Sequence, residues 1–349
     1  MGRADALGSL TAVEHDPGVS NLASLIRLEW LLHTRPREAT HTIESRLPAL
    51  LDQFAAVGDE RGLARAHMIA FNRDWLASRA TPAARELKLA AEHAQNAGDD
   101  GLLSRALALM VATLIYGPTP AGEMAAELDR IEERGRGAYL QGFVEAGRCE
   151  VERLEGRFDE ARRRARRSTS AFAAMRSILQ GWGWELLAAI EVSDGDLAAA
   201  LAALEQADAL DVEFGEHAFR STHQARIAEV RFLRDERNAA RAAIELSDTL
   251  SAAEDVINYA VTHRVRARLA LAEGDGAEAE RWAQSAVRHA FLTDFPVPQA
   301  EATLDLARVL SALGRPAPAR AQARAALALY ESKGDRPGVA RTRAMLDEL

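Results

Sequence analysis

Few residues in the chain have the type and spacing that phosphate chemistry requires. A phosphate-binding loop ends in Gly-Lys-Ser or Gly-Lys-Thr, so that backbone amides and one lysine hold the phosphates. The 349 residues include only two lysines, Lys88 and Lys333, which lie in Arg-Glu-Leu-Lys-Leu and Glu-Ser-Lys-Gly. The glycine pairs within 181–183 and 274–276 follow no strand pattern, which a dinucleotide site would need. The sequence therefore argues against both kinds of nucleotide site.

The histidines and the cysteine do not form a recognisable catalytic or metal site. Nine histidines are scattered along the chain, and no two have the i, i+4 spacing with an intervening glutamate that zinc hydrolases use. Cys149 lies where a helix is expected to place a small core residue, so we interpret it as packing and not as a nucleophile. We expect no catalytic residue, no metal ligand and no cofactor, and hence a protein that is not an enzyme.

The run from Arg162 to Thr169 is the most strongly basic stretch, with five arginines. Such a run could contact an acidic partner or nucleic acid, and its Arg-Arg-Ser sequence resembles the sites of basophilic kinases. The alternative is a solvated helix face whose arginines pair with Glu155, Asp159 and Glu160 at helical spacings. We favour the solvated face, because the chain as a whole is acidic and takes nearly all its positive charge from arginine.

Composition and charge exclude several classes of protein. The net charge of −9 does not favour a broad attraction to nucleic acid or to a membrane surface. The longest strongly apolar run, residues 106–116, is far shorter than the roughly 20 residues that span a bilayer. Residues 1–20 lack the pattern of a signal peptide, and the chain has one cysteine, which fits a reducing cytoplasm. We therefore expect a cytoplasmic protein without nucleic-acid or membrane partners.

The helices and turns that must position any functional residue follow a repeating sequence pattern. Turn residues recur at intervals of 38 to 40, and each is followed by small residues that begin a helix pattern. These turn landmarks are Arg79, Gly117, Gly156, Gly195, Asp235, Gly274 and Gly314. The fifth residue after each landmark is alanine in six cases and glycine, Gly122, in one. Fixed-period similarity of this length is typical of a solenoid, in which each unit buries its apolar face against its neighbours.

A second set of turns alternates with the landmarks and marks the joints between units. They lie at Gly58, Gly98, Gly135, 175–180, Gly215, Glu254, Asp294 and Gly334. The two sets predict eight helix hairpins, starting at Asn21, and a final capping helix over 337–349. Residues 1–20 read as an irregular lead-in, and residues 21–349 as a single helical repeat domain, because no linker or low-complexity tract divides them. The predicted fold is an all-α, right-handed α-solenoid with a period of about 39 residues.

The unit resembles the tetratricopeptide repeat (TPR). Gly156-Arg-Phe158-Asp-Glu-Ala161 and Gly195-Asp-Leu197-Ala-Ala-Ala200 match its turn, and counting back from Gly195 places Trp184 at the family's bulky position. The period exceeds the roughly 34 residues of the family, so the helices should be about one turn longer. The resemblance implies a scaffold that binds a peptide or a partner protein on its concave surface.

Further motifs look like the C-terminal repeat arrays of large actinobacterial signalling proteins. They are Tyr116-Gly-Pro-Thr-Pro120, Leu154–Ala161, Thr293-Asp-Phe295, Leu304–Leu310 and Gly314-Arg-Pro316. In that family the array follows an ATPase domain and a nucleotide-cyclase or DNA-binding output domain. The resemblance implies bacterial signalling and, as an alternative function, the ligand-sensing array of a split regulator. An ATPase, a cyclase or a transcriptional output protein would then be the partner.

The repeat register points to one set of residues that could bind a partner. Trp182 lies two residues before Trp184, toward the inner surface, where charges of both signs are expected around it. The inner candidates are Trp182, Phe143, Glu150, Arg153, Glu185, Arg264, Arg268, Glu301 and Arg308. An aromatic anchor among charges suits peptide or protein recognition. Packing of Trp182 between neighbouring helices is the equally open alternative.

Overall fold

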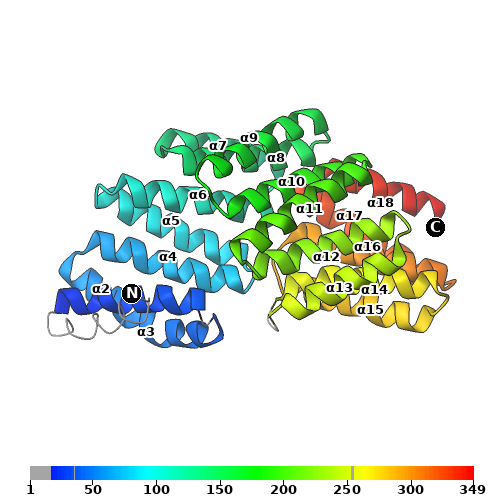
Figure 1. Ribbon diagram of the computed structural model, residues 1–349, viewed down its shortest axis with the longest axis horizontal. Helices are drawn as coiled ribbons and strands as arrows, with labels where there is room; N and C mark the ends of the chain where they lie inside the picture. The colour runs from blue at the N-terminus through cyan, green and yellow to red at the C-terminus, as the bar shows by residue number, and fades with distance from the viewer. Residues whose placement is uncertain (1–16, 35, 253–254) are drawn as a thin grey trace.

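A computed structural model describes residues 17–34, 36–252 and 255–349, and every regular element in these ranges is a helix (Figure 1). The helices are Pro17–Thr34 (α2), Pro36–Val57 (α3), Glu60–Leu76 (α4), Ala80–Asn96 (α5), Asp100–Tyr116 (α6), Ala121–Arg134 (α7), Ala138–Leu154 (α8), Phe158–Ala174 (α9), Leu179–Asp194 (α10), Leu197–Phe214 (α11), Ala218–Leu233 (α12), Arg237–Leu250 (α13), Val256–Ala272 (α14), Gly276–Ala290 (α15), Pro296–Ala312 (α16), Pro316–Lys333 (α17) and Arg336–Glu348 (α18). They form eight hairpins, α2/α3 to α16/α17, followed by α18. The prediction of an all-α solenoid is confirmed.

The even-numbered helices form the inner layer of the stack. From α2 to α16, each even-numbered helix contacts the next even-numbered one, whereas the substantial contacts of the odd-numbered helices are all with even-numbered ones. A stack whose members touch on one side and spread on the other must curve toward the touching side. We call the side of α8, α10, α12, α14 and α16 that lines the inside of this curve the inner face.

Small residues allow the two helices of most hairpins to approach closely. The residue four positions after the helix N-cap is fully buried alanine in six hairpins, and in five of them it is the predicted one: Ala161, Ala200, Ala240, Ala279 and Ala319. Their landmark residues have positive φ, including the non-glycine Asp235 at 62°. These five landmarks therefore lie at the turn inside each hairpin, as the repeat pattern predicts.

Two landmarks were assigned the wrong register. In the α4/α5 hairpin the residue with positive φ is Ser78 and not Arg79, so the buried alanine at the crossing is Ala83 instead of Ala84. The α6/α7 turn is longer, Gly117–Pro120, and the buried residue at the crossing is Met124, while Gly122 is exposed. The larger side chain fits a hairpin in which α6 and α7 contact each other much less than the helices of other hairpins do.

The ends of the chain differ slightly from the predicted boundaries. Helix α2 begins at Pro17, four residues before the predicted start at Asn21, while residues 1–16 and the joint at Glu254 lie outside the described residues. Helix α3 begins at Pro36, as expected from its position, and continues through Pro48. The capping helix α18 begins at Arg336, where the side chain of Asp335 accepts a hydrogen bond from the N–H of Gly338.

The superhelix closes on itself, so that the last repeats touch the early ones. In Figure 1 the chain climbs from α3 to α9 and then descends through α10 to α15. The carboxylate of Asp294, before α16, accepts hydrogen bonds from the N–H groups of Ala80 and Thr81 at 2.6 and 2.7 Å. The ammonium of Lys333, at the end of α17, reaches the end of α6. We call this junction, between residues 75–81 and 114–121 on one side and 293–295 and 333–335 on the other, the seam.

Candidate binding surface on the inner face

The aromatic part of the inner face is packed and closed. The indole of Trp182, on α10, is 5% exposed, and its N–H donates to the hydroxyl of Tyr116 at 2.8 Å. Its ring lies 5.2 Å from that of Phe143, on α8, which also packs against Phe172. The structure thus brings two of the predicted inner residues, Trp182 and Phe143, into contact. Of the two interpretations left open for Trp182, the structure agrees with packing between neighbouring helices, because Tyr116 and the neighbouring rings cover the indole.

A buried ion pair continues the inner face along α8. The guanidinium of Arg153 donates twice to the carboxylate of Glu150, at 2.6 and 2.8 Å, and both side chains are buried. Burial by itself would lower the pKa of Arg153, but the charge of Glu150 outweighs it and raises the pKa. Asp335, on the far side of the seam, lies 3.8 Å from the same guanidinium. The two predicted residues Glu150 and Arg153 therefore neutralise each other within the protein.

Three successive inner helices are joined by one arginine. Arg264, on α14, donates to Glu229 of α12 at 2.8 Å and to Glu301 and Asp305 of α16 at 2.5 and 2.8 Å. Burial alone would raise the pKa of Glu229, but Arg264 and Arg268 lower it to about 2. Because an unpaired buried charge is costly, such a cation among three carboxylates holds its helices in one register.

The remaining predicted arginines surround the same carboxylates. Arg268 contacts Glu229 at 3.3 Å and Asp305 at 2.8 Å, and Arg308 contacts Asp305 at 2.6 Å. The side chain of Arg308 is 45% exposed, whereas that of Arg264 is 4% exposed. The structure thus brings Arg264, Arg268 and Arg308 together with Glu301, and of the three arginines only Arg308 is substantially exposed.

Glu185 belongs to a buried histidine site. The Nδ1 of His223, which is fully buried on α12, lies 2.5 Å from the carboxylate of Asp211, and its Nε2 lies 3.7 Å from that of Glu185. Burial would lower the pKa of His223, but the two carboxylates outweigh burial and raise it to about 9. The imidazole is therefore a cation at neutral pH, and its charge lowers the pKa of Glu185 against the effect of burial.

Sequence reasoning missed the residues that complete this surface. Tyr116 contacts Trp182, and burial, with the negative charges of Glu185 and Glu150, raises the pKa of its hydroxyl. The others are Arg226, Glu229, Asp305, Asp211, His223 and Lys333. The signal for Tyr116 was present, because it begins one of the motifs quoted above. The signal for Lys333 was its rarity, as one of two lysines in an arginine-rich chain.

The basic run on α9 is a paired helix face, as favoured. Arg162 contacts Asp159, Glu191 and Asp194, and Arg163 contacts Glu160. Arg164 and Arg167 lie beside Glu145 and Glu160, while Glu155 pairs with Arg157 instead. The kinase-site alternative is wrong, because Ser168 is fully buried and donates to the carbonyl of Gly142 at 2.8 Å.

Cys149 is buried in the core, as predicted, and burial raises the pKa of its thiol. Within the described ranges, no three or more His, Cys, Asp and Glu side chains are grouped in a way that could hold a metal ion. No helix in the described part of the chain combines the length and the apolar character that crossing a membrane requires.

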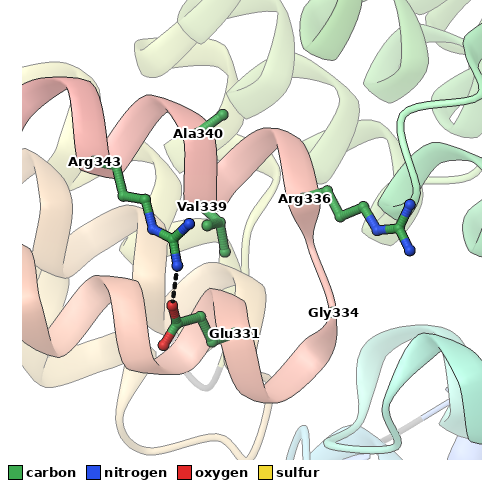
Figure 2. A pocket seen from close by; sticks show the side chains of 6 residues that line it. All are labelled: Glu331, Gly334, Arg336, Val339, Ala340 and Arg343. Atoms are coloured by element: carbon green, nitrogen blue, oxygen red, sulfur yellow. Dashed lines mark hydrogen bonds and ion pairs between the residues drawn. The ribbon is translucent and has the colours of Figure 1, made fainter.

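A shallow pocket of ≈ 410 Å³ lies at the C-terminal end of the stack, between α17 and α18. Its lining residues are Glu331, Gly334, Arg336, Val339, Ala340 and Arg343. Arg343 and Glu331 form an ion pair at 2.8 Å. Figure 2 shows these two side chains facing each other, while Arg336 points away from them. The pocket is formed by α17, α18 and the turn between them, outside the inner face, so we do not include it in the candidate surface.

The similarities to known proteins concern the fold. No protein-family model and no curated protein matches the sequence. Among solved structures, a chain of the APC/C hetero-tetramer Cut9–Hcn1 aligns with 90% of this chain at 14% identity and a TM-score of 0.64. The fold is a TPR-like solenoid. The alignment covers 54% of that longer chain, so the protein spans about half of its length.

Two further solved structures have comparable folds. The Rap protein complexed with Competence and Sporulation Factor has a TM-score of 0.52 at 12% identity, and the alignment covers 94% of this chain and 87% of that one. Yeast Tom70 has a TM-score of 0.51 at 12% identity, with 96% and 64% covered. At such low identity the likeness establishes the architecture alone.

Proposed function

We propose that the protein is a non-catalytic scaffold that binds a peptide or a segment of a partner protein on its inner face. The observation that carries this proposal is the concentration of opposite charges there, on the helices α8 to α16. Of the nine predicted residues, Arg308, Glu301, Glu185 and Arg268 keep side-chain exposures between 45% and 14%. These four offer charges of both signs at one surface, which suits the charged and backbone groups of a peptide.

The fold comparison supports the same class of ligand. The Rap protein, whose fold is similar, was solved with Competence and Sporulation Factor bound, and the matched Cut9–Hcn1 chain is part of a protein complex. We infer by analogy that this solenoid also holds a polypeptide, in bacterial signalling as the sequence motifs imply. The analogy is one of architecture, so the residues named above carry the specific claim.

Peptide selection tests the proposal. A phage-displayed library of random 12-residue peptides is panned against the full-length protein, and enriched peptides are measured by fluorescence anisotropy. Arg308→Ala is expected to weaken binding by about tenfold, because it removes an accessible charge-assisted contact. Arg324→Ala is the matched control, since Arg324 is exposed on α17, outside the inner layer. Peptides that bind wild type and both variants equally would contradict binding on the inner face.

A second candidate function is favoured by the seam. A solenoid whose last repeats touch earlier ones can change curvature when the junction opens, which suits an array that senses a ligand and controls a separate ATPase, cyclase or transcriptional output protein. Neighbouring coding sequence discriminates the two, because an adjacent ATPase or cyclase reading frame is expected for a split regulator and not for a general scaffold.

A further inference from the structure

Two helix ends at the seam obtain their caps from the opposite side of the superhelix. The N-cap residue of α5, Arg79, makes no side-chain capping bond, and the first two N–H groups of the helix bond instead to Asp294. A carboxylate is favoured at a helix N-terminus, because the free N–H groups there carry partial positive charge. Asp294 therefore caps a helix more than two hundred residues away in sequence.

The second cap is a buried cation at a helix C-terminus. The ammonium of Lys333 is fully buried and donates to the carbonyls of Leu114, Gly117 and Thr119 at 2.8, 2.6 and 3.0 Å. These carbonyls belong to the last turn of α6 and the segment after it, where the helix dipole favours a positive charge. All three donors of the ammonium are thus used by the opposite side of the seam.

Between the two caps lies a cluster of three aromatic rings. The ring of Phe295 is 6.0 Å from that of Trp75 and 5.6 Å from that of Tyr116. Tyr116 also accepts the hydrogen bond of Trp182, so this ring connects the seam directly to the inner face. The seam contacts described here come from turns and helix ends, and none requires a layer of helix packing to separate.

We propose that the superhelix is held shut by the two transverse caps, Asp294 on α5 and Lys333 on α6, and that their release uncovers the inner face. The closed form is supported by the seam contacts alone and requires no ligand. The further claim, that opening regulates the entry of a ligand, rests on the proposed function. In the closed form the inner aromatic and ionic side chains are satisfied by one another, so a peptide must compete with closure for them.

Chemical labelling of Lys333 measures closure directly. Lys88 is exposed, and it is the only other lysine, so a water-soluble acetylating ester followed by mass spectrometry reads both residues in one full-length protein. In the wild type, Lys333 should react about a hundredfold more slowly than Lys88, because it reacts only after opening. Equal rates would overturn the closed form.

A pair of aspartate variants tests the cap. Asp294→Ala is expected to speed the labelling of Lys333 about tenfold without changing that of Lys88 or the far-UV circular dichroism. Asp275→Ala is the matched control, because Asp275 caps its own helix α15, through the N–H of Glu278, and lies outside the seam. Unchanged protection in Asp294→Ala, or equal acceleration in both variants, would overturn the proposal. If Asp294→Ala fails to fold, Asp294→Asn takes its place, because its amide oxygen can still accept one of the two bonds.

The two caps should be coupled in both directions. Lys333→Met is expected to speed amide exchange at Ala80 and Thr81 about tenfold, because coupling between two sites is reciprocal. Lys88→Met is the control and should change neither amide. Independent behaviour of the two caps would contradict a single seam that opens as a unit.

Access to the inner face is measured without a ligand. Acrylamide should quench the fluorescence of Asp294→Ala more strongly than that of wild type. This extra quenching should be lost in the double variant Asp294→Ala/Trp182→Phe, and Asp275→Ala should not show it. A peptide selected on the inner face should then bind Asp294→Ala about tenfold more tightly than wild type. An opened seam with unchanged peptide affinity would refute regulation by closure, whereas an opened seam with no inner-face peptide at all would refute the proposed function and leave closure standing.

Discussion

The stack and the seam hold the same solenoid with different chemistry. Along the stack, helices pack through buried alanines such as Ala279, and Arg264 joins carboxylates 35 to 41 residues away. Across the seam, Asp294 and Lys333 bond to backbone groups more than two hundred residues away. The stack buries side chain against side chain, while the seam satisfies helix ends around one aromatic cluster. The difference teaches that repeat packing fixes the fold, whereas a few contacts between turns and helix ends fix whether the superhelix is open.

Breaking the ionic network of the stack is expected to have the largest effect. Arg264→Met keeps a long side chain but leaves the carboxylates of Glu229, Glu301 and Asp305 without their shared cation, which costs about 3–5 kcal/mol. Chemical denaturation followed by circular dichroism measures the loss. Arg308→Met is the control: it removes a half-exposed partner of the same Asp305 and should cost about 1 kcal/mol or less. Equal losses would mean that the buried cation does not carry the stack.

Breaking the seam should be smaller and local. Phe295→Ala removes the ring between Trp75 and Tyr116, which is worth about 3 kcal/mol of closure. Amides of residues 114–121 should then exchange roughly a hundredfold faster, while those of α12 to α15 keep their protection. Phe291→Ala is the control, because that ring is 52% exposed on the same turn and should change neither region. Faster exchange throughout α12 to α15 would show that seam and stack open together.

The two regions should respond oppositely to alkaline pH. The pKa of His223 is about 9 in the fold and about 6.5 in the unfolded chain, so its contribution is full below pH 6.5 and is lost as the pH rises through 9. The unfolding free energy should fall by about 1.5 kcal/mol between pH 6.5 and 8.0. His223→Gln should remove this slope, and a slope that persists in the variant would exclude His223 as its source.

Lys333 limits the pH range in which His223 alone changes the unfolding free energy. Burial lowers the pKa of Lys333 to about 8 from 10.5, so the unfolded chain binds more protons and stability rises with pH between these values. This gain enters mainly above pH 8.0, where it opposes the loss from His223. The histidine of the inner face and the lysine of the seam can therefore be separated by pH.

The helix hairpins were predictable because their signals are local. A turn with positive φ and a small residue at the following crossing can be read within one unit, as at Gly195 and Ala200. The register failed at Arg79 and Gly117 for local reasons as well: Ser78 adopts the positive φ, and two prolines lengthen the α6/α7 turn. Residue propensities do not predict that a serine will adopt a positive φ.

The inner face was predictable as a set of residues but not as a surface. Counting along the repeat brought Phe143 to Trp182 and Glu150 to Arg153, because these pairs lie on adjacent or identical inner helices. The burial of Trp182 involves Tyr116, which accepts its hydrogen bond and packs against Phe295 across the seam. Both residues were in motifs recognised from sequence, yet repeat periodicity has no information about which units meet after a full turn.

The smallest expected change in stability is at Gly122, where the stack and the seam meet. Gly122 lies in the first turn of α7, beside Ala121, and a Cβ added to it would have no atom within 4 Å. Gly122→Ala is therefore expected to stabilise the protein by about 0.5–1 kcal/mol, through better helix propensity and a less flexible unfolded chain. Thermal unfolding measures the gain. Gly195→Ala, at φ 93°, is the opposite control and should destabilise the protein.

The sign of the Gly122 result sharpens the comparison. A Cβ on Gly334, across the seam, would lie 3.3 Å from the Cβ of Ala121, so Ala121 faces the seam whereas Gly122, next to it, does not. A gain in stability with unchanged labelling of Lys333 is the result expected if α7 belongs to the stack. A loss of stability with faster labelling would mean that this turn also forms part of the seam, and that closure involves more of α7 than Ala121.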